Sequence, residues 1–265
     1  LILLELLKGE WNKMINLSVP NLSMDILENL KECLESGWVS TGGRFIPEFE
    51  GKVIKYMKTK YAAGVQSGTA GLHMSLQVLG VQRDEEVIAP TLTFIAAVNP
   101  ITYLGANPVF IDCDDSLCMD PLKLEKFCSE ECDYIDGVLI NKKTKRKIRA
   151  LVVVHVFGNM ADMEKIMDIA KKYNLKVLED ATEALGTYYT EGKYKGKYAG
   201  TIGDIGVLSF NANKIITTGG GGMVVGDNEE LVEKVRFLSS QAKKDTLYFI
   251  HDEIGYNYRM LNLQA

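Results

Sequence analysis

Short apolar runs alternate with amphipathic stretches along most of the chain. The runs predict strands at residues 61–65, 86–89, 109–111, 150–156, 176–180, 205–210 and 223–225. The β-branched run at 150–156 is typical of a strand buried on both faces. Apolar positions at helical spacing predict helices at 23–37, 45–58, from Thr69 onward, 94–104 and 162–173. This alternation predicts an α/β fold with a largely parallel central sheet flanked by helices.

One stretch, residues 139–149, breaks the pattern because it is rich in lysine and arginine. It predicts a hairpin with residues 141–144 at its tip. A charge run of this kind is usually a solvated turn, and the alternative is a contact with an anionic ligand or a neighbouring subunit.

Composition narrows the class of protein. The chain has 265 residues, 46% of them apolar and 25% charged, which is the balance of a globular protein. A net charge of −5 argues against a nucleic-acid partner. No apolar run reaches the ~18 residues that a membrane span requires, and the apolar opening Leu1–Leu7 contains Glu5 and lacks a basic region before it. We therefore expect neither a membrane span nor a signal peptide.

The cysteines indicate a reducing compartment. Their number is five, an odd count in a chain without a secretory signal, which favours reduced thiols in a cytoplasmic protein. Their spacings suit a zinc site poorly, and no histidine is near them in sequence. Because the chain starts without Met and ends at Ala265 within a helix-like pattern, we expect a fragment, with an arm at 1–22 and one domain at 23–265.

Three polar signals follow predicted strands, where open α/β sheets bind ligands. Ser67-Gly68-Thr69-Ala70 begins a helix, whose free N–H groups suit a phosphate. Asp180 ends a strand, and Lys214 follows another and precedes a glycine-rich turn. Each signal alone has a plain interpretation, as a helix cap or a surface charge. Together they are the parts of a pyridoxal 5′-phosphate (PLP) site, in which a lysine amine binds the aldehyde, a carboxylate pairs with the ring nitrogen and a helix start holds the phosphate.

Several longer motifs carry a resemblance to a known family. They are Gly37-Trp38-Val39-Ser40-Thr41-Gly42, the tetrapeptide 67–70, Ala89-Pro90-Thr91-Leu92-Thr93-Phe94, His155-Val156-Phe157-Gly158, Glu179-Asp180-Ala181, Ser209-Phe210 ahead of Lys214, and Gly255-Tyr256-Asn257-Tyr258-Arg259-Met260. With these motifs the chain resembles the DegT/StrS-type nucleotide-sugar aminotransferases nearly end to end. The resemblance implies the PLP-binding major domain of the aspartate-aminotransferase fold (fold type I), a homodimer, and a small C-terminal domain that is missing here.

The resemblance also implies roles around the cofactor. Lys214 matches the Schiff-base lysine, which also carries the proton between cofactor and substrate carbon. Asp180 matches the partner of the pyridine nitrogen, and Phe94 the aromatic side chain that stacks on the ring. Glu183 matches a glutamine or glutamate near the phenolic oxygen.

Further matches concern the phosphate. The resemblance implies that it is held by Gly68, Thr69 and Ala70, with Ser209 as a second donor. Asn257 matches an asparagine that reaches the phosphate across the dimer interface. Arg259, two residues further on, is a weaker candidate for binding the negative charge of that phosphate.

The implied activity is transfer of an amino group from an amino acid, expected to be glutamate, to a keto carbon of a nucleotide-linked deoxysugar in polysaccharide biosynthesis. The insertion 113–149 and the opening residues 16–21 resemble the branch associated with legionaminic-acid-type sugars. Three alternatives stay open: a PLP-dependent sugar dehydratase, in which histidine replaces the lysine, an inactive regulatory homologue, and a sugar-nucleotide binder without cofactor. The sequence departs from the usual pattern at 184–186, 211–213 and 219–222, which bears on the substrate side.

Overall fold

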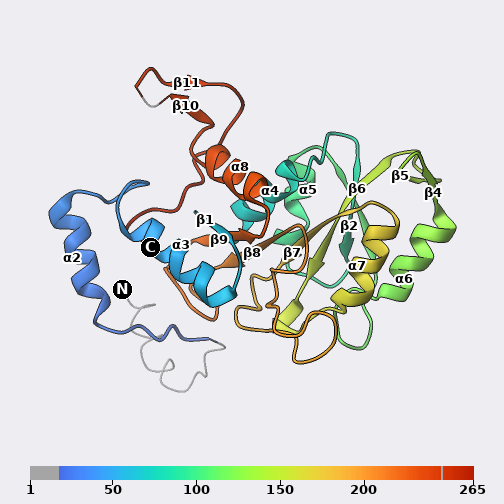
Figure 1. Ribbon diagram of the computed structural model, residues 1–265, viewed down its shortest axis with the longest axis horizontal. Helices are drawn as coiled ribbons and strands as arrows, with labels where there is room; N and C mark the ends of the chain where they lie inside the picture. Colours follow the sequence, from blue (N-terminus) through green and yellow to red (C-terminus); the bar gives the residue numbers. More distant parts are fainter. Residues whose placement is uncertain (1–17, 246) are drawn as a thin grey trace, which may run out of the picture.

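A mixed sheet of nine strands forms the centre of the protein (Figure 1). The computed structural model describes residues 18–245 and 247–265, so most of the expected arm at 1–22 lies outside the described residues. Seven strands form the path of the sheet, in the order β1 (Tyr61–Val65), β9 (Gly222–Gly226), β8 (Ile205–Ser209), β7 (Lys176–Asp180), β6 (Lys147–Val154), β2 (Glu86–Pro90) and β3 (Asn107–Ile111). The remaining two, β4 (Cys132–Ile135) and β5 (Val138–Asn141), extend the sheet beside β6.

The sheet is parallel from β3 through β2, β6 and β7 to β8, as the sequence predicts. Strand β9 runs antiparallel to both β8 and β1, so the prediction of a largely parallel sheet is too simple at this end. The connections differ in length: the segment 210–221 joins β8 to β9 as a short turn without a helix, whereas the longer segment 181–204 leads from β7 to its parallel neighbour β8. Gly219 and Gly221 in this connection have φ of 78° and 99°, which side chains disfavour.

Helices flank the sheet, apart from the first, which lies away from it. Most bounds match the predicted periodicity, but the helices at 121–126 and 229–239 were not predicted. The helices are α2 (Ile26–Ser36), α3 (Phe45–Met57), α4 (Gly68–Val78), α5 (Asn99–Tyr103), α6 (Pro121–Lys126), α7 (Met163–Lys172) and α8 (Glu229–Ser239). The helix predicted at 94–104 is instead a short 3-10 turn, η2 (Ile95–Ala97), followed by α5. Pro100 explains the break, because proline has no N–H to donate to the turn before it and is tolerated only in the first turn of a helix.

Two regions lie away from this body. The hairpin of β10 (Lys243–Asp245) and β11 (Ile250–His251) projects from the end of α8 (Figure 1). Helix α2 buries only Cys33 and leaves Leu27 and Leu34 half exposed or more.

The predicted basic hairpin is confirmed as the antiparallel pair β5–β6. None of the helices in the described ranges is long and apolar enough to cross a membrane.

Candidate active site

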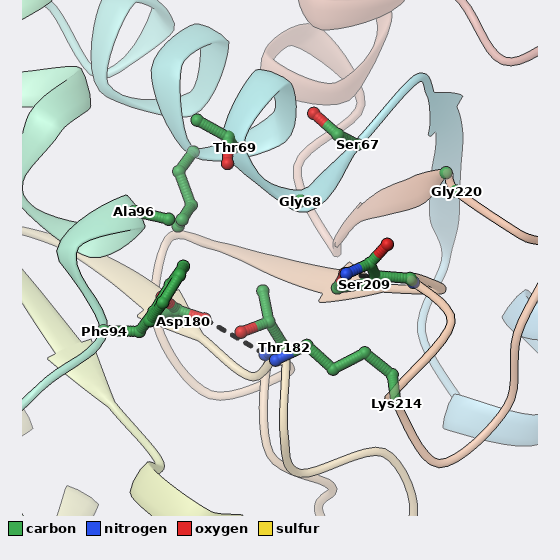
Figure 2. Close-up of a pocket in the computed structure, with 13 residues that line it drawn as sticks. Ser67, Gly68, Thr69, Phe94, Ala96, Asp180, Thr182, Ser209, Lys214 and Gly220 are labelled. Atoms are coloured by element: carbon green, nitrogen blue, oxygen red, sulfur yellow. Dashed lines mark hydrogen bonds between the residues drawn. The ribbon is translucent and has the colours of Figure 1, made fainter. Parts of the chain in front are cut away.

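A cavity of about 250 Å³ lies where the carboxyl ends of β7 and β8 meet the start of α4 (Figure 2). Strands that end side by side in the sheet bring residues far apart in sequence to this edge. Six of the predicted site residues line the cavity: Gly68, Thr69, Phe94, Asp180, Ser209 and Lys214. Ala70, Glu183 and Asn257 are not among its lining residues.

The start of α4 forms one wall of the cavity. Ser67 is the N-cap, and its Oγ accepts a hydrogen bond of 3.1 Å from the amide of Ala70. That amide is therefore already used within the helix end. Gly68 approaches Ser209 so closely that a Cβ at position 68 would lie 3.1 Å from the Ser209 Cβ. A side chain there would occupy the space between the helix start and β8, so glycine keeps this cradle open.

Asp180 forms the opposite wall and is only 5% exposed. Its Oδ1 accepts a hydrogen bond of 3.0 Å from the amide of Thr182 (Figure 2). Burial raises the pKa of Asp180, although the bonds from Thr182 and the positive charge of Lys214 act against that rise. A carboxylate whose charge is penalised by burial is stabilised by a cation placed beside it in the cavity.

Lys214 reaches the cavity from the loop after β8, and its side chain is 14% exposed. Its Nζ lies 3.2 Å from Glu183 Oε1. The other oxygen of Glu183 accepts a hydrogen bond of 3.0 Å from the amide of Phe157. Glu183 is thus the ion-pair partner of the lysine without lining the cavity, a contact that the sequence did not indicate.

Phe94 stands at the mouth of the cavity. It follows β2 in extended backbone geometry just before η2, and its side chain is 73% exposed. Phe94 and Asp180 line the same cavity (Figure 2). An exposed aromatic ring at the rim of a polar cavity is available to stack on a planar ligand.

The segment after β11 lies outside the cavity of its own chain. Asn257 is exposed. Arg259 turns inward instead: its guanidinium donates to Glu50 Oε1 at 2.7 Å and to the carbonyl of Gly64 at 2.9 Å. Arg259 therefore anchors α3 and β1 and does not face the cavity.

Sequence reasoning did not single out every residue around the cavity. The lining residues without a predicted role are Leu72, Ala96, Thr182, Asn211, Gly220 and Gly221, together with Ser67, which the sequence placed in the phosphate motif but gave no separate task. Two of them, Thr182 and Asn211, are polar residues just beyond β7 and β8, so the same strand-end rule would have found them. Leu72 and Ala96 carry no comparable signal, because apolar residues in helices are usually core.

The donor set fits PLP. The first amides of a helix lack intrahelical acceptors, and α4 offers them together with the hydroxyls of Thr69 and Ser209 to a phosphate. Buried Asp180 suits a protonated ring nitrogen, and Lys214 is an amine in reach of the same space. The cradle kept open by Gly68 provides room at the phosphate end.

A mixed α/β sheet with a lysine, a buried carboxylate and a helix start around one strand-end cavity defines a PLP-binding class of protein. The comparisons with known proteins agree and are more specific. The DegT/DnrJ/EryC1/StrS aminotransferase family matches residues 20–265, and the chain belongs to this family.

Named relatives refine this picture. GDP-perosamine synthase of Escherichia coli O157:H7 is 42% identical over 253 residues, covering 96% of this chain and 64% of that protein. The enzyme of the same name from Caulobacter vibrioides is 38% identical over 252 residues, covering 95% and 62%. The chain thus spans less than two thirds of the length of these relatives.

Solved structures show the same fold. PseC of Helicobacter pylori, an aminotransferase of pseudoaminic acid biosynthesis, matches with a TM-score of 0.79 and 29% identity, over 95% of this chain and 63% of that one. Spr1654 of Streptococcus pneumoniae, solved in its PLP form, matches with a TM-score of 0.80 and 25% identity, over 94% and 64%.

Proposed function

We propose that this chain forms the cofactor-binding part of a PLP-dependent aminotransferase acting on a nucleotide-linked keto-deoxysugar, with an amino acid, expected to be glutamate, as donor. One observation carries the proposal: Lys214 and buried Asp180 line the same cavity as the start of α4. The sequence similarity to GDP-perosamine synthases supports a nucleotide sugar as acceptor. A cytoplasmic location and a 23–265 major domain belong to the same proposal.

Each residue would have a distinct task. Bound here, the cofactor supplies an aldehyde for amines and a ring that delocalises electrons. Lys214 would hold the cofactor through its Nζ, and the same amine would carry the proton that the reaction moves. Asp180 holds the ring in its cationic form, while Thr69 and Ser209 donate to the phosphate. Glu183, 3.2 Å from Nζ, orients the lysine.

The direct test is Lys214→Ala. Proton transfer by a positioned group is typically worth ~10²–10⁴-fold in rate, so turnover should fall at least that far. After incubation with PLP and reduction by borohydride, mass spectrometry should find the cofactor fixed to Lys214 in the wild type and to no residue in the variant.

Lys193→Ala is the matched control, because Lys193 pairs with Asp168 on the surface and does not line the cavity. It should keep both turnover and labelling. Labelling of another lysine, or a variant at position 214 with near-wild-type rate, would refute the proposal.

The alternative activities give different outcomes. A dehydratase of this family carries histidine at the lysine position, so Lys214 favours the aminotransferase. A regulatory homologue would bind PLP and turn yellow but would not bleach with glutamate. A protein that stays colourless with PLP would be a sugar-nucleotide binder.

A homodimer with shared sites is part of the proposal. Asn257 is exposed and outside its own cavity, so the role implied by the resemblance is possible only toward a second copy. The exposed apolar residues Leu247, Tyr248 and Phe249 on the nearby hairpin are available for that contact. Sedimentation of the purified protein at micromolar concentration tests this: a monomer would contradict it.

A further inference from the structure

His73 lies buried in the middle of α4 among three tyrosine rings. Its side chain is 6% exposed, and neither ring nitrogen has a hydrogen-bond partner among the described residues. The ring centroid lies 5.5 Å from that of Tyr103, 5.0 Å from Tyr256 and 6.1 Å from Tyr258, each at a steep interplanar angle. Edge-to-face packing of this kind is favourable between aromatic rings and fixes their relative orientation.

Two of these tyrosines flank Asn257. The rings of Tyr256 and Tyr258 stack at 5.0 Å with an interplanar angle of 14°, so both project to the same side of the segment. Successive side chains of an extended segment alternate in direction. Asn257 therefore points the other way, in agreement with its exposure.

The backbone of this segment is fixed as well. The Tyr256 amide donates to the carbonyl of Leu238 at 2.7 Å, and the Tyr258 amide to that of Ser239 at 2.9 Å. Tyr256 Oη also donates to Gln77 on α4 at 2.9 Å. The helix whose start forms the proposed phosphate seat thus holds the segment through both His73 and Gln77.

We propose that His73 is a positioning residue: it packs Tyr256 and Tyr258 inward so that Asn257 faces a second copy of the chain and completes that copy's phosphate site. This inference rests on the proposed function. It assigns to a buried histidine, which touches neither cofactor nor substrate, control over a residue that acts in the neighbouring subunit.

A double-mutant cycle tests it, with pyridoxamine 5′-phosphate as the probe because it binds without bonding to Lys214. Its dissociation constant is measured by calorimetry for the wild type, His73→Ala, Asn257→Ala and the double variant. Asn257→Ala should weaken binding by about 10- to 100-fold, the range for a hydrogen bond to a charged group. His73→Ala should weaken binding in the wild-type background and have no further effect in the Asn257→Ala background.

Two further variants separate positioning from loss of packing. His73→Phe keeps an aromatic ring and should restore affinity to within about twofold of the wild type. Leu76→Ala, in the fully buried part of the same helix, should lower the melting temperature without showing any dependence on Asn257. If His73→Ala does not fold, His73→Leu, which lacks the aromatic faces, replaces it in the cycle.

The outcomes are distinct. Additive effects of His73→Ala and Asn257→Ala, or an Asn257→Ala variant with wild-type affinity, would overturn the role of His73 while leaving Lys214 and Asp180 untouched. A wild-type protein that fails to bind pyridoxamine 5′-phosphate would overturn the proposed function itself, and this inference with it.

Discussion

Two consecutive carboxylates on β7 lie in opposite surroundings. Glu179 is fully buried and accepts hydrogen bonds from His155 Nε2 at 2.8 Å and from the backbone amides of Gly200, Ile202 and Gly203. Asp180 points to the other face, where it lines the cavity. Alternation along a strand places the two side chains on opposite sides of the sheet.

The difference shows in their ionisation. Burial alone would raise the pKa of Glu179, but the hydrogen bonds from His155 and the backbone amides hold it below its usual range. For Asp180 burial dominates and raises the pKa. Glu179 has its donors within the fold, whereas Asp180 has fewer, which leaves it to be completed by a cationic ligand. One strand thus carries a carboxylate bonded within the fold and one that faces the cavity, where the proposed function gives it a chemical role.

Replacing Glu179 should have the largest effect on stability. The amide of Glu179→Gln cannot accept from all of its present donors, and each hydrogen bond to a charged group typically contributes ~1.5–3 kcal/mol. We expect a loss of this size in the free energy of urea unfolding. Asp180→Asn is the matched control in the same strand. An equal loss in both variants would contradict the claim that Glu179, and not Asp180, stabilises the fold.

Replacing Asp180 should instead affect chemistry. Loss of one preorganised electrostatic group commonly lowers turnover by ~10²–10³-fold, and we expect Asp180→Asn to fall in that range. The cofactor-free variant should be at least as stable as the wild type, because a penalised charge is removed. Steady-state rates with PLP and calorimetric melting without it check the two halves separately. A strongly destabilised Asp180→Asn protein would contradict this assignment.

The pH dependence of the two variants should differ in sign. A raised folded pKa means that Asp180 favours folding below about pH 3.9 and loses that contribution as pH rises through the folded value. The advantage of Asp180→Asn should therefore be present at pH 7 and shrink on acidification.

Glu179 behaves in the opposite way. Its lowered pKa gives stability above about pH 4.3 that is lost as pH falls further. The wild type should therefore lose stability on acidification, and the deficit of Glu179→Gln relative to it should shrink. Each protonation changes stability by at most ~1.4 kcal/mol per pH unit. Cofactor-free urea titrations from about pH 7 down to about pH 2 cover both windows. Parallel curves for the two variants would refute the difference in sign.

The contrast also marks what local sequence can predict. Asp180, Lys214 and Thr69 were found because parallel strands bring their carboxyl ends to one edge, and a strand-end rule needs only local pattern. The partners of Glu183 and Arg259 were not found, because Lys214 and Glu50 meet them only through the tertiary fold. The antiparallel β9 was missed for a related reason: apolar runs reveal strands but not their direction.

Replacing Ser67 should have the smallest effect of these substitutions. It tests whether a residue that lines the cavity can contribute to stability alone. Ser67 lines the same cavity as Asp180, but its Oγ accepts a hydrogen bond from the Ala70 amide, so we assign it to the stability of the helix end. Ser67→Ala should cost ~1 kcal/mol, which is typical of a lost N-cap, and lower the melting temperature by about 2–4 °C. Because the substitution frees the Ala70 amide for a phosphate, affinity for pyridoxamine 5′-phosphate should change less than about threefold. A large loss of affinity with an unchanged melting temperature would contradict this assignment. Ser67 would then bind the ligand, as we propose for Asp180, and would not mainly stabilise the helix end as a cap.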